Sequence, residues 1–141
     1  MKGKKIVLGI TGGIAAYKSA EIASRLKKSG ADVRVVMTRH ATEFISPRTF
    51  QEITKNPVAV EMFADVVNFD ESHISLANFA DVILIAPATA NFLAKMAHGI
   101  ADDLLTTTIL ATPAQVIVSP AMNTVMLENP ATQDNLKILE S

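Results

Sequence analysis

The stretch KKIVLGITGG, residues 4–13, decides the fold class of this chain. Its apolar run Ile6-Val7-Leu8 is typical of a buried strand, and two adjacent glycines separate that strand from a helical pattern. A second apolar run over residues 32–37 predicts another strand after the helix. Strand, helix and strand in this order form a βαβ unit, which indicates an α/β fold with parallel strands.

The helix of this unit is predicted over residues 14–29. Ile14, Ile22 and Leu26 fall on one face at helical spacing, and we expect that face to pack on the sheet. Gly30 follows at the position where glycine most often ends a helix.

The rest of the chain continues the alternation of strands and helices. Near-continuous apolar runs at residues 81–86 and 115–118 predict two more strands, covered on both faces. Residues 57–70 fit either a short strand or irregular structure. Short helices broken at Pro47 are predicted over residues 38–54, and a further helix over 73–79. The next helix is predicted to run from the turn at 87–91 to about residue 99, and another from a cap at Asp102 or Asp103 to residue 110. The last helix is predicted to begin after Pro130, with Leu136 and Leu139 facing the core.

We therefore predict a three-layer, Rossmann-like (flavodoxin-like) parallel sheet with helices on both faces. The sequence contains no repeats or linkers, so residues 1–141 are expected to form one domain.

Composition excludes several classes of protein. Charged residues make up 19% of the chain and apolar residues 49%, which excludes a disordered chain. A net charge of −1 argues against a nucleic-acid partner, and no apolar run reaches the roughly 18 residues of a membrane span. With no cysteine and no signal-peptide pattern, we expect a cytoplasmic protein. The mean hydropathy of +0.28 is high for a small monomer and suggests surfaces covered by partner subunits.

Small or polar residues follow each predicted strand, at residues 11–13, at Thr38, at 88–91 and at 121–123. The carboxyl ends of parallel strands share one edge of a sheet, where ligands bind. Backbone amides at Gly12 and Gly13 favour an anionic group such as phosphate, although the glycines could serve only the tight turn.

Other ligand motifs do not match. Gly9, Gly12 and Gly13 lack the dinucleotide spacing, and Asp32 begins the second strand instead of ending it. No Gly-Lys-Ser/Thr, metal-ligand spacing or Gly-x-Ser-x-Gly motif is present. The ligand class that remains is a mononucleotide, held by backbone amides and by hydroxyls such as those of Thr38 and Thr89. Taken alone, His73 reads as a surface or capping residue.

Four motifs together resemble the homo-oligomeric flavin-containing cysteine decarboxylases. They are TGGIAA at residues 11–16, HISLA at 73–77, APATAN at 86–91 and PAMN at 120–123. Within that family, AHGIADDLL at residues 97–105 is most similar to the bacterial phosphopantothenoylcysteine decarboxylases of coenzyme A biosynthesis. The resemblance runs from about Lys4 to the end of the sequence.

The resemblance implies FMN as cofactor, bound between subunits of a trimer or dodecamer, and no metal. It implies His73 as the catalytic histidine and Asn123 as the residue that binds the substrate carboxylate. The implied FMN contacts are Gly12, Gly13, Ile14, Thr38, Phe44, Thr89, Ala90, Asn91, Phe92, Ala121 and Met122.

The implied reaction converts 4′-phosphopantothenoylcysteine to 4′-phosphopantetheine. Direct loss of CO₂ would leave an unstabilised carbanion, so FMN first oxidises the cysteine moiety to a thioaldehyde that accepts the electrons. Histidine is suited to the proton step, and a neutral asparagine orients a carboxylate without opposing its departure.

The sequence departs from the family at two places. Leu127 replaces the aromatic residue of the motif that begins at Pro120. The chain also stops at Ser141, before the flap whose cysteine supplies the final proton and before the ligase domain found in many bacterial members, so we expect a longer natural chain. The missing cysteine fits one alternative, a peptidyl-cysteine decarboxylase of lantibiotic maturation. A non-catalytic FMN-binding subunit is the second alternative.

Overall fold

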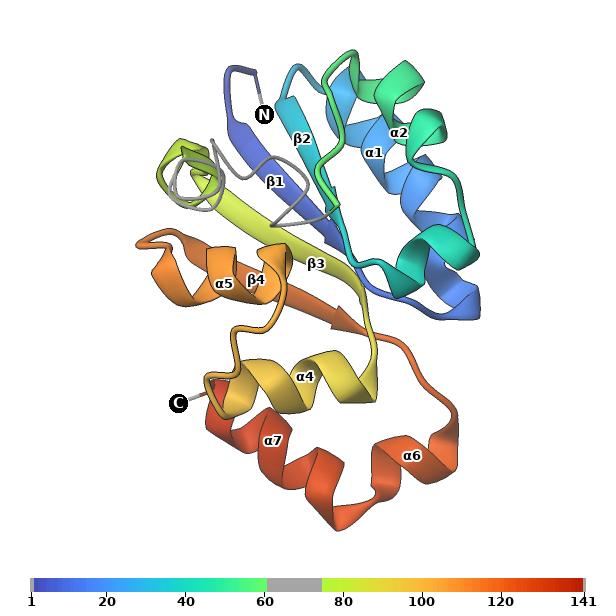
Figure 1. The fold of residues 1–141 in the computed structure, drawn as a ribbon, viewed down its shortest axis with the longest axis vertical. Coiled ribbons are helices and arrows are strands. Elements are labelled where there is room, and N and C mark those ends of the chain that lie inside the picture. The colour runs from blue at the N-terminus through green and yellow to red at the C-terminus, as the bar shows by residue number, and fades with distance from the viewer. Residues whose placement is uncertain (1, 61–74, 141) are drawn as a thin grey trace.

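The computed structural model describes residues 2–60 and 75–140. In them, four parallel strands form one sheet in the order β2-β1-β3-β4 (Figure 1). The strands are β1 (Lys5–Ile10), β2 (Asp32–Met37), β3 (Val82–Ala88) and β4 (Gln115–Pro120). All four predicted strands are confirmed, and the order places the βαβ unit at one side of the sheet.

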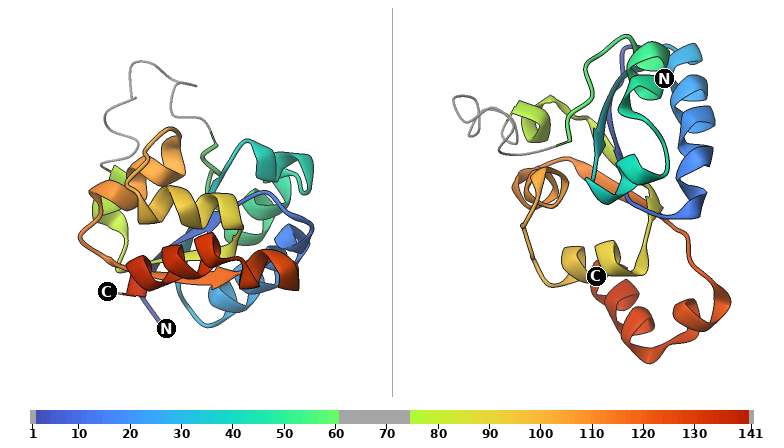
Figure 2. Two further views of the ribbon diagram at one scale, coloured as in Figure 1. Left: turned by 90° about the horizontal axis from the view of Figure 1, so that it is seen from below. Right: turned by 45° about the vertical axis from the view of Figure 1, so that its right-hand side comes forward.

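Helices cover both faces of this sheet, as predicted. On one face, α1 (Ser19–Lys28) and α2 (Pro47–Thr54) pack over a core that includes Leu8, Val33 and Phe50. On the other face, α4 (Ala90–Ala97) and α5 (Leu104–Ala111) enclose a second core. Figure 2 shows α1 and α5 on opposite sides of the sheet.

The chain ends on the α4 side. There α7 (Pro130–Glu140) packs along α4, and Leu136 and Leu139 contact the second core, as predicted. The short helix α6 (Thr124–Glu128) precedes it and was not predicted from the sequence.

Gly9 permits the close approach of α5 to the sheet. A Cβ atom at this position would lie 2.7 Å from Ile85 Cδ1 and 2.8 Å from Leu105 Cδ1. Any side chain at Gly9 would therefore push α5 away from β1 and β3.

The predicted helix over residues 14–29 is only partly right. Ile14–Lys18 forms a 3₁₀ helix, η1, and the α-helix begins at Ser19. Ile22 and Leu26 pack on the core as expected, but Ile14 is 83% exposed. A 3₁₀ helix has three residues per turn, so α-helical spacing does not extend back to Ile14. Gly30 ends α1 with a φ of 98°, as its predicted position requires.

The segment between β2 and residue 60 contains η2 (His40–Glu43) and α2. Pro47 begins α2 rather than interrupting a helix, and Ser46 caps it by accepting a hydrogen bond from Arg48 N at 3.2 Å. Ala59 forms an isolated parallel bridge with Val36. Residues 75–79 are helical, in agreement with the predicted helix, whereas residues 61–74 lie outside the described part.

None of the helices in the described part combines the length and apolar character that crossing a membrane requires.

Candidate functional site

The turns after all four strands border one cleft of about 990 Å³. This volume lies at the upper end of the range for small-molecule sites, about 300–1,000 Å³. The lining residues are Thr11, Gly12, Gly13, Ile14, Ala15, Thr38, Arg39, His40, Pro87, Thr89, Ala90, Asn91, Phe92, Lys95, Asp103, Ala121, Met122, Asn123 and Met126. The structure thus brings together the four turns that the sequence placed at one edge of the sheet.

Thr11 joins the turn after β1 to the turn after β3. Its buried hydroxyl donates to the carbonyl oxygen of Pro87 at 2.7 Å and accepts from the backbone amide of Thr89 at 3.0 Å. A second buried bond, from Ser19 Oγ to the carbonyl oxygen of Ala86 at 2.7 Å, fixes the start of α1 beside the same turn. All three bonds join residues far apart in sequence. Sequence analysis placed Thr11 in the turn after the first strand but gave no role to its hydroxyl or to Ser19.

The two glycines of the first turn differ in their surroundings. A Cβ atom at Gly12 would overlap the imidazole ring of His40, which follows β2. A Cβ atom at Gly13 would lie 3.5 Å from Thr89 Cγ2, an ordinary contact, and the Gly13 backbone is extended. Gly12 is therefore required by the fold itself, whereas Gly13 leaves backbone open to the cleft.

The helix α4 points its N-terminus at the cleft. Thr89 caps it, accepting from Phe92 N at 3.2 Å, and Ala90 and Asn91 of the first turn line the cleft. The first turn of an α-helix has backbone amides without intrahelical acceptors and carries a partial positive charge. By contrast, the glycine turn after β1 leads into the short η1 and not directly into α1.

Asn123 lies in the turn after β4 and caps α6. Its side-chain oxygen accepts from Met126 N at 2.9 Å. Within the described part, its Nδ2 group has no hydrogen-bond partner, so two donors remain available to a ligand.

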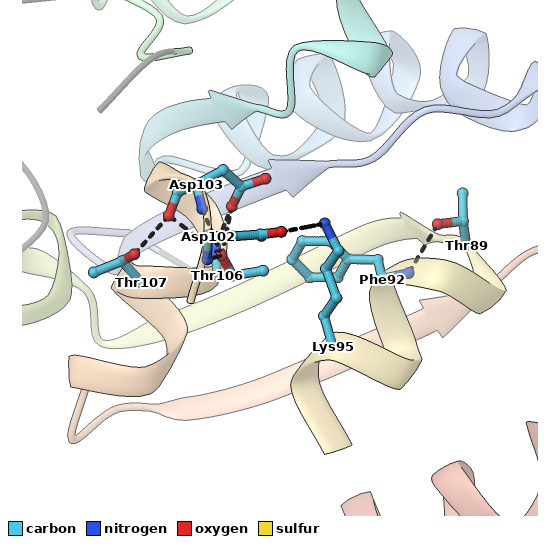
Figure 3. Close-up of polar contacts among 7 residues, drawn as sticks. All are labelled: Thr89, Phe92, Lys95, Asp102, Asp103, Thr106 and Thr107. Atoms are coloured by element: carbon cyan, nitrogen blue, oxygen red, sulfur yellow. Dashed lines mark hydrogen bonds and ion pairs between the residues drawn. The ribbon is translucent and has the colours of Figure 1, made fainter. Parts of the chain in front are cut away.

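Charged side chains occupy the wall between α4 and α5 (Figure 3). Lys95 Nζ lies 2.9 Å from an Asp102 carboxylate oxygen. Asp103 caps α5, accepting from Thr106 N at 2.8 Å and from Thr106 Oγ1 at 2.7 Å. The predicted cap by Asp102 or Asp103 is thereby resolved in favour of Asp103.

Three predicted site residues need separate mention. The Thr38 hydroxyl lines the cleft but accepts from Ala41 N at 3.1 Å. Phe44 does not line the cleft; its ring stands edge-on to His40, with centroids 5.4 Å apart. His73 lies outside the described residues.

Lining residues that sequence analysis did not select include Arg39, His40, Lys95 and Met126. The sequence could have indicated these residues, because each follows a predicted strand or lies on a helix next to one of the four turns. Across residues 2–60 and 75–140, no three His, Cys, Asp or Glu side chains are grouped so that they could hold a metal ion.

The profile of the Flavoprotein family matches residues 1–141. The chain belongs to the Flavoprotein family. This membership agrees with the parallel α/β sheet and with a ligand cleft at the carboxyl ends of its strands.

Among sequence relatives of this Flavoprotein chain is the coenzyme A biosynthesis bifunctional protein CoaBC of Vibrio vulnificus. The two are 53% identical over 139 residues, which are 99% of this chain and 35% of the relative. The chain thus spans about a third of the length of that protein.

Solved structures share the fold of this chain. An FMN-dependent cysteine decarboxylase, SpaF, superposes with a TM-score of 0.89 and 34% identity, over 97% of this chain and 79% of SpaF. A mutant PPC decarboxylase complexed with pantothenoylaminoethenethiol superposes with a TM-score of 0.84 and 31% identity, over 99% of this chain and 78% of the other.

Proposed function

We propose that this chain is the FMN-dependent domain, residues 1–141, that decarboxylates 4′-phosphopantothenoylcysteine to 4′-phosphopantetheine in cytoplasmic coenzyme A biosynthesis. The observation that carries the proposal is the cleft, which combines the first-turn amides of α4 with the exposed side chain of Asn123. The 53% identity to CoaBC and the likeness to a PPC decarboxylase support the choice of substrate.

The residues of the cleft fit a flavin mononucleotide. The open backbone at Gly13 and the first-turn amides of α4 at Ala90 and Asn91 would hold the phosphate. Apolar side chains of the same cleft, Phe92 and Met122 among them, would border the ring system, with Ala121, Ile14 and Thr38 nearby. Phe44 would act through His40, which it contacts.

Bound FMN would supply an acceptor for the hydride equivalent on the carbon that bears sulfur, so that the thioaldehyde formed can receive the electrons released with CO₂. Asn123 would hold the departing carboxylate through its Nδ2 hydrogens. Because asparagine is uncharged, it would orient the carboxylate without stabilising its negative charge as strongly as a cation does. His73 is proposed to take the thiol proton.

A second copy of the chain is proposed to complete the cleft. Ile14 on one lip and Met126 on the other line the cleft and are largely exposed, as is their neighbour Tyr17. Apolar groups at the lips of a ligand cleft favour an interface between subunits, consistent with a trimer or dodecamer. A ligase domain elsewhere in the natural protein is proposed from the 35% share of CoaBC that the chain covers.

The deciding experiment is an anaerobic titration of the FMN-loaded chain. We expect the purified protein to bind FMN and turn yellow, and 4′-phosphopantothenoylcysteine to bleach the flavin absorbance while CO₂ is released. A peptide with a C-terminal cysteine serves as the alternative substrate. Preference for the peptide would overturn the substrate assignment, and a chain that stays colourless after FMN addition would overturn the function.

His73→Asn tests the proton step in the same assay. We expect this variant to keep its yellow colour but to show no bleaching by the substrate, because the thiol proton has no acceptor. Bleaching at the rate of the unmodified protein would remove His73 from the mechanism.

A further inference from the structure

An ion pair in the wall of the cleft has no part in the proposed decarboxylation. Lys95 Nζ lies 2.9 Å from Asp102 Oδ2 and 3.1 Å from Asp102 Oδ1 (Figure 3). The Lys95 side chain lines the cleft and is only 25% exposed, whereas lysine usually keeps its ammonium group in water.

This pair differs from the other ion pairs found in the described ranges. Those join residues three or four positions apart, and their side chains are far more exposed. The Lys95–Asp102 pair spans seven positions and connects α4 to the residues that lead into α5. It therefore acts as a cross-link between two helices and not as support for a single helix.

The connection between α4 and α5 is also fixed on either side of Asp102. Ile100 N donates to the carbonyl oxygen of Lys95 at 3.0 Å, and Asp102 N donates to Thr106 Oγ1 at 3.1 Å. His98 Nε2 lies 2.9 Å from Asn135 Oδ1 of α7. Asp103, the next residue, faces the cleft, so movement of Asp102 would move the cleft wall.

We propose that Lys95 and Asp102 are positioning residues for the cofactor: their ion pair holds the connection between α4 and α5 in the place that the bound flavin requires. This inference rests on the proposed function, because it assumes that FMN is the occupant of the cleft.

The charges of the wall allow positioning to be separated from simple electrostatics. Lys95 pairs with the Asp102 carboxylate, Asp103 also lines the cleft, and the phosphate of FMN is an anion. If charge alone mattered, Lys95→Met would weaken FMN binding, whereas Asp102→Asn would strengthen it. If the ion pair positions the wall, both substitutions abolish that ion pair and both weaken binding.

The test is the dissociation constant for FMN, measured by fluorescence quenching on the full chain. Lys95→Met and Asp102→Asn are each expected to raise it by about tenfold, and the double variant by no more than either alone, because coupled partners are not additive. Lys95→Arg keeps the charge and hydrogen-bond donors and should stay near the unmodified protein. Arg25→Met breaks an exposed ion pair on α1, with N···O of 2.7 Å, and is the matched control with unchanged FMN binding.

Melting temperatures of the cofactor-free proteins show whether each variant folds. If a single variant does not fold, the exchanged pair Lys95→Asp with Asp102→Lys carries the test, since it restores attraction and should recover FMN binding. Three outcomes would overturn the proposal. The first is that Asp102→Asn binds FMN as tightly as, or more tightly than, the unmodified chain. The others are a double variant whose loss of FMN affinity equals the sum of the two single losses, and an exchanged pair that folds but binds FMN no better than Lys95→Met. An unmodified chain that binds no FMN would overturn the proposed function first.

Discussion

At the scale of single residues, the amide group of Asn123 has two roles: it caps α6, and it is proposed to bind the substrate carboxylate. Its oxygen caps α6 by accepting from Met126 N, and the residue lines the cleft, so the nitrogen is the half of the amide group left for a ligand. A carboxylate accepts hydrogen bonds and donates none, so the exposed Nδ2 group is the half of the side chain that suits it. The cap thus decides which half of Asn123 the substrate would meet.

Asn123→Asp separates the cap from the proposed substrate contact. Aspartate is as good an N-cap as asparagine, so the free energy of unfolding should change by less than about 0.5 kcal/mol. The new side chain has no donor and repels a carboxylate, so we expect kcat/KM for CO₂ release to fall at least about tenfold. The measurements are turnover and urea unfolding.

The matched control is Asn129→Asp. Asn129 accepts from Ala131 N at 2.9 Å in the same way, but it lies at the start of α7 and does not line the cleft. It should change neither quantity. Turnover by Asn123→Asp equal to that of the control would remove Asn123 from substrate binding.

Side-chain pairings far apart in sequence were beyond sequence analysis. The hydroxyl of Thr11 and the amide of Thr89 are 78 positions apart, and which hydroxyl meets which amide depends on the register of β1 against β3. The overlap that a side chain at Gly12 would make with His40 depends in the same way on the register of β1 against β2. Sequence analysis found the turns because glycine and polar residues after a strand are local signals.

At the scale of elements, the sheet is connected to α4 through Thr11. Replacement of Thr11 by the similarly shaped valine removes both hydrogen bonds of the hydroxyl. The Thr89 amide then loses its acceptor, and the Pro87 oxygen keeps only the longer bond from the Thr11 backbone amide, at 3.3 Å. We expect a loss of about 1–3 kcal/mol in the free energy of unfolding. The midpoint of urea unfolding should fall with an unchanged slope, and FMN binding should weaken as the turns separate.

Thr11→Ser provides the comparison for this prediction. Serine keeps the hydroxyl and loses one buried methyl group, which costs about 1 kcal/mol. Valine and serine variants of equal stability and equal FMN affinity would show that the two hydrogen bonds do not hold the turns together.

Elements marked by an apolar run or by a capping residue were predicted correctly. The helix α6 and the 3₁₀ start of the first helix were not. The apolar runs of β1 to β4 and the Asp103 cap of α5 are such signals. In α6 the apolar residues Val125, Met126 and Leu127 are consecutive and exposed, so no helical period marks this element. At Ile14 the change to a 3₁₀ helix altered the period itself.

At the scale of the whole molecule, exposed apolar residues lie close in the chain to residues that line the cleft. Tyr17 follows the first turn and is 64% exposed, and Val125 on α6 is 79% exposed. The high mean hydropathy of +0.28 predicted such surfaces without locating them, because it is a property of composition. Their place in the chain, close to cleft-lining residues, is the reason for proposing that assembly and cofactor binding are connected.

Val125→Glu tests that connection. Val125 has almost no contact to lose within one chain, so the substitution should leave the melting temperature of an isolated chain nearly unchanged. At an interface between copies, a buried and unpaired carboxylate opposes association. We expect sedimentation velocity to show smaller species than the unmodified protein forms, together with weaker FMN binding, since the second lip of the cleft is lost.

The control variant is Leu110→Glu, on α5 at a position that is 63% exposed and outside the cleft lining. It shows whether any added charge has this effect, and it should change neither measurement. An assembly of unchanged size with Val125→Glu would mean that this lip of the cleft faces solvent, and a monomer that binds FMN fully would mean that one chain completes the cleft alone.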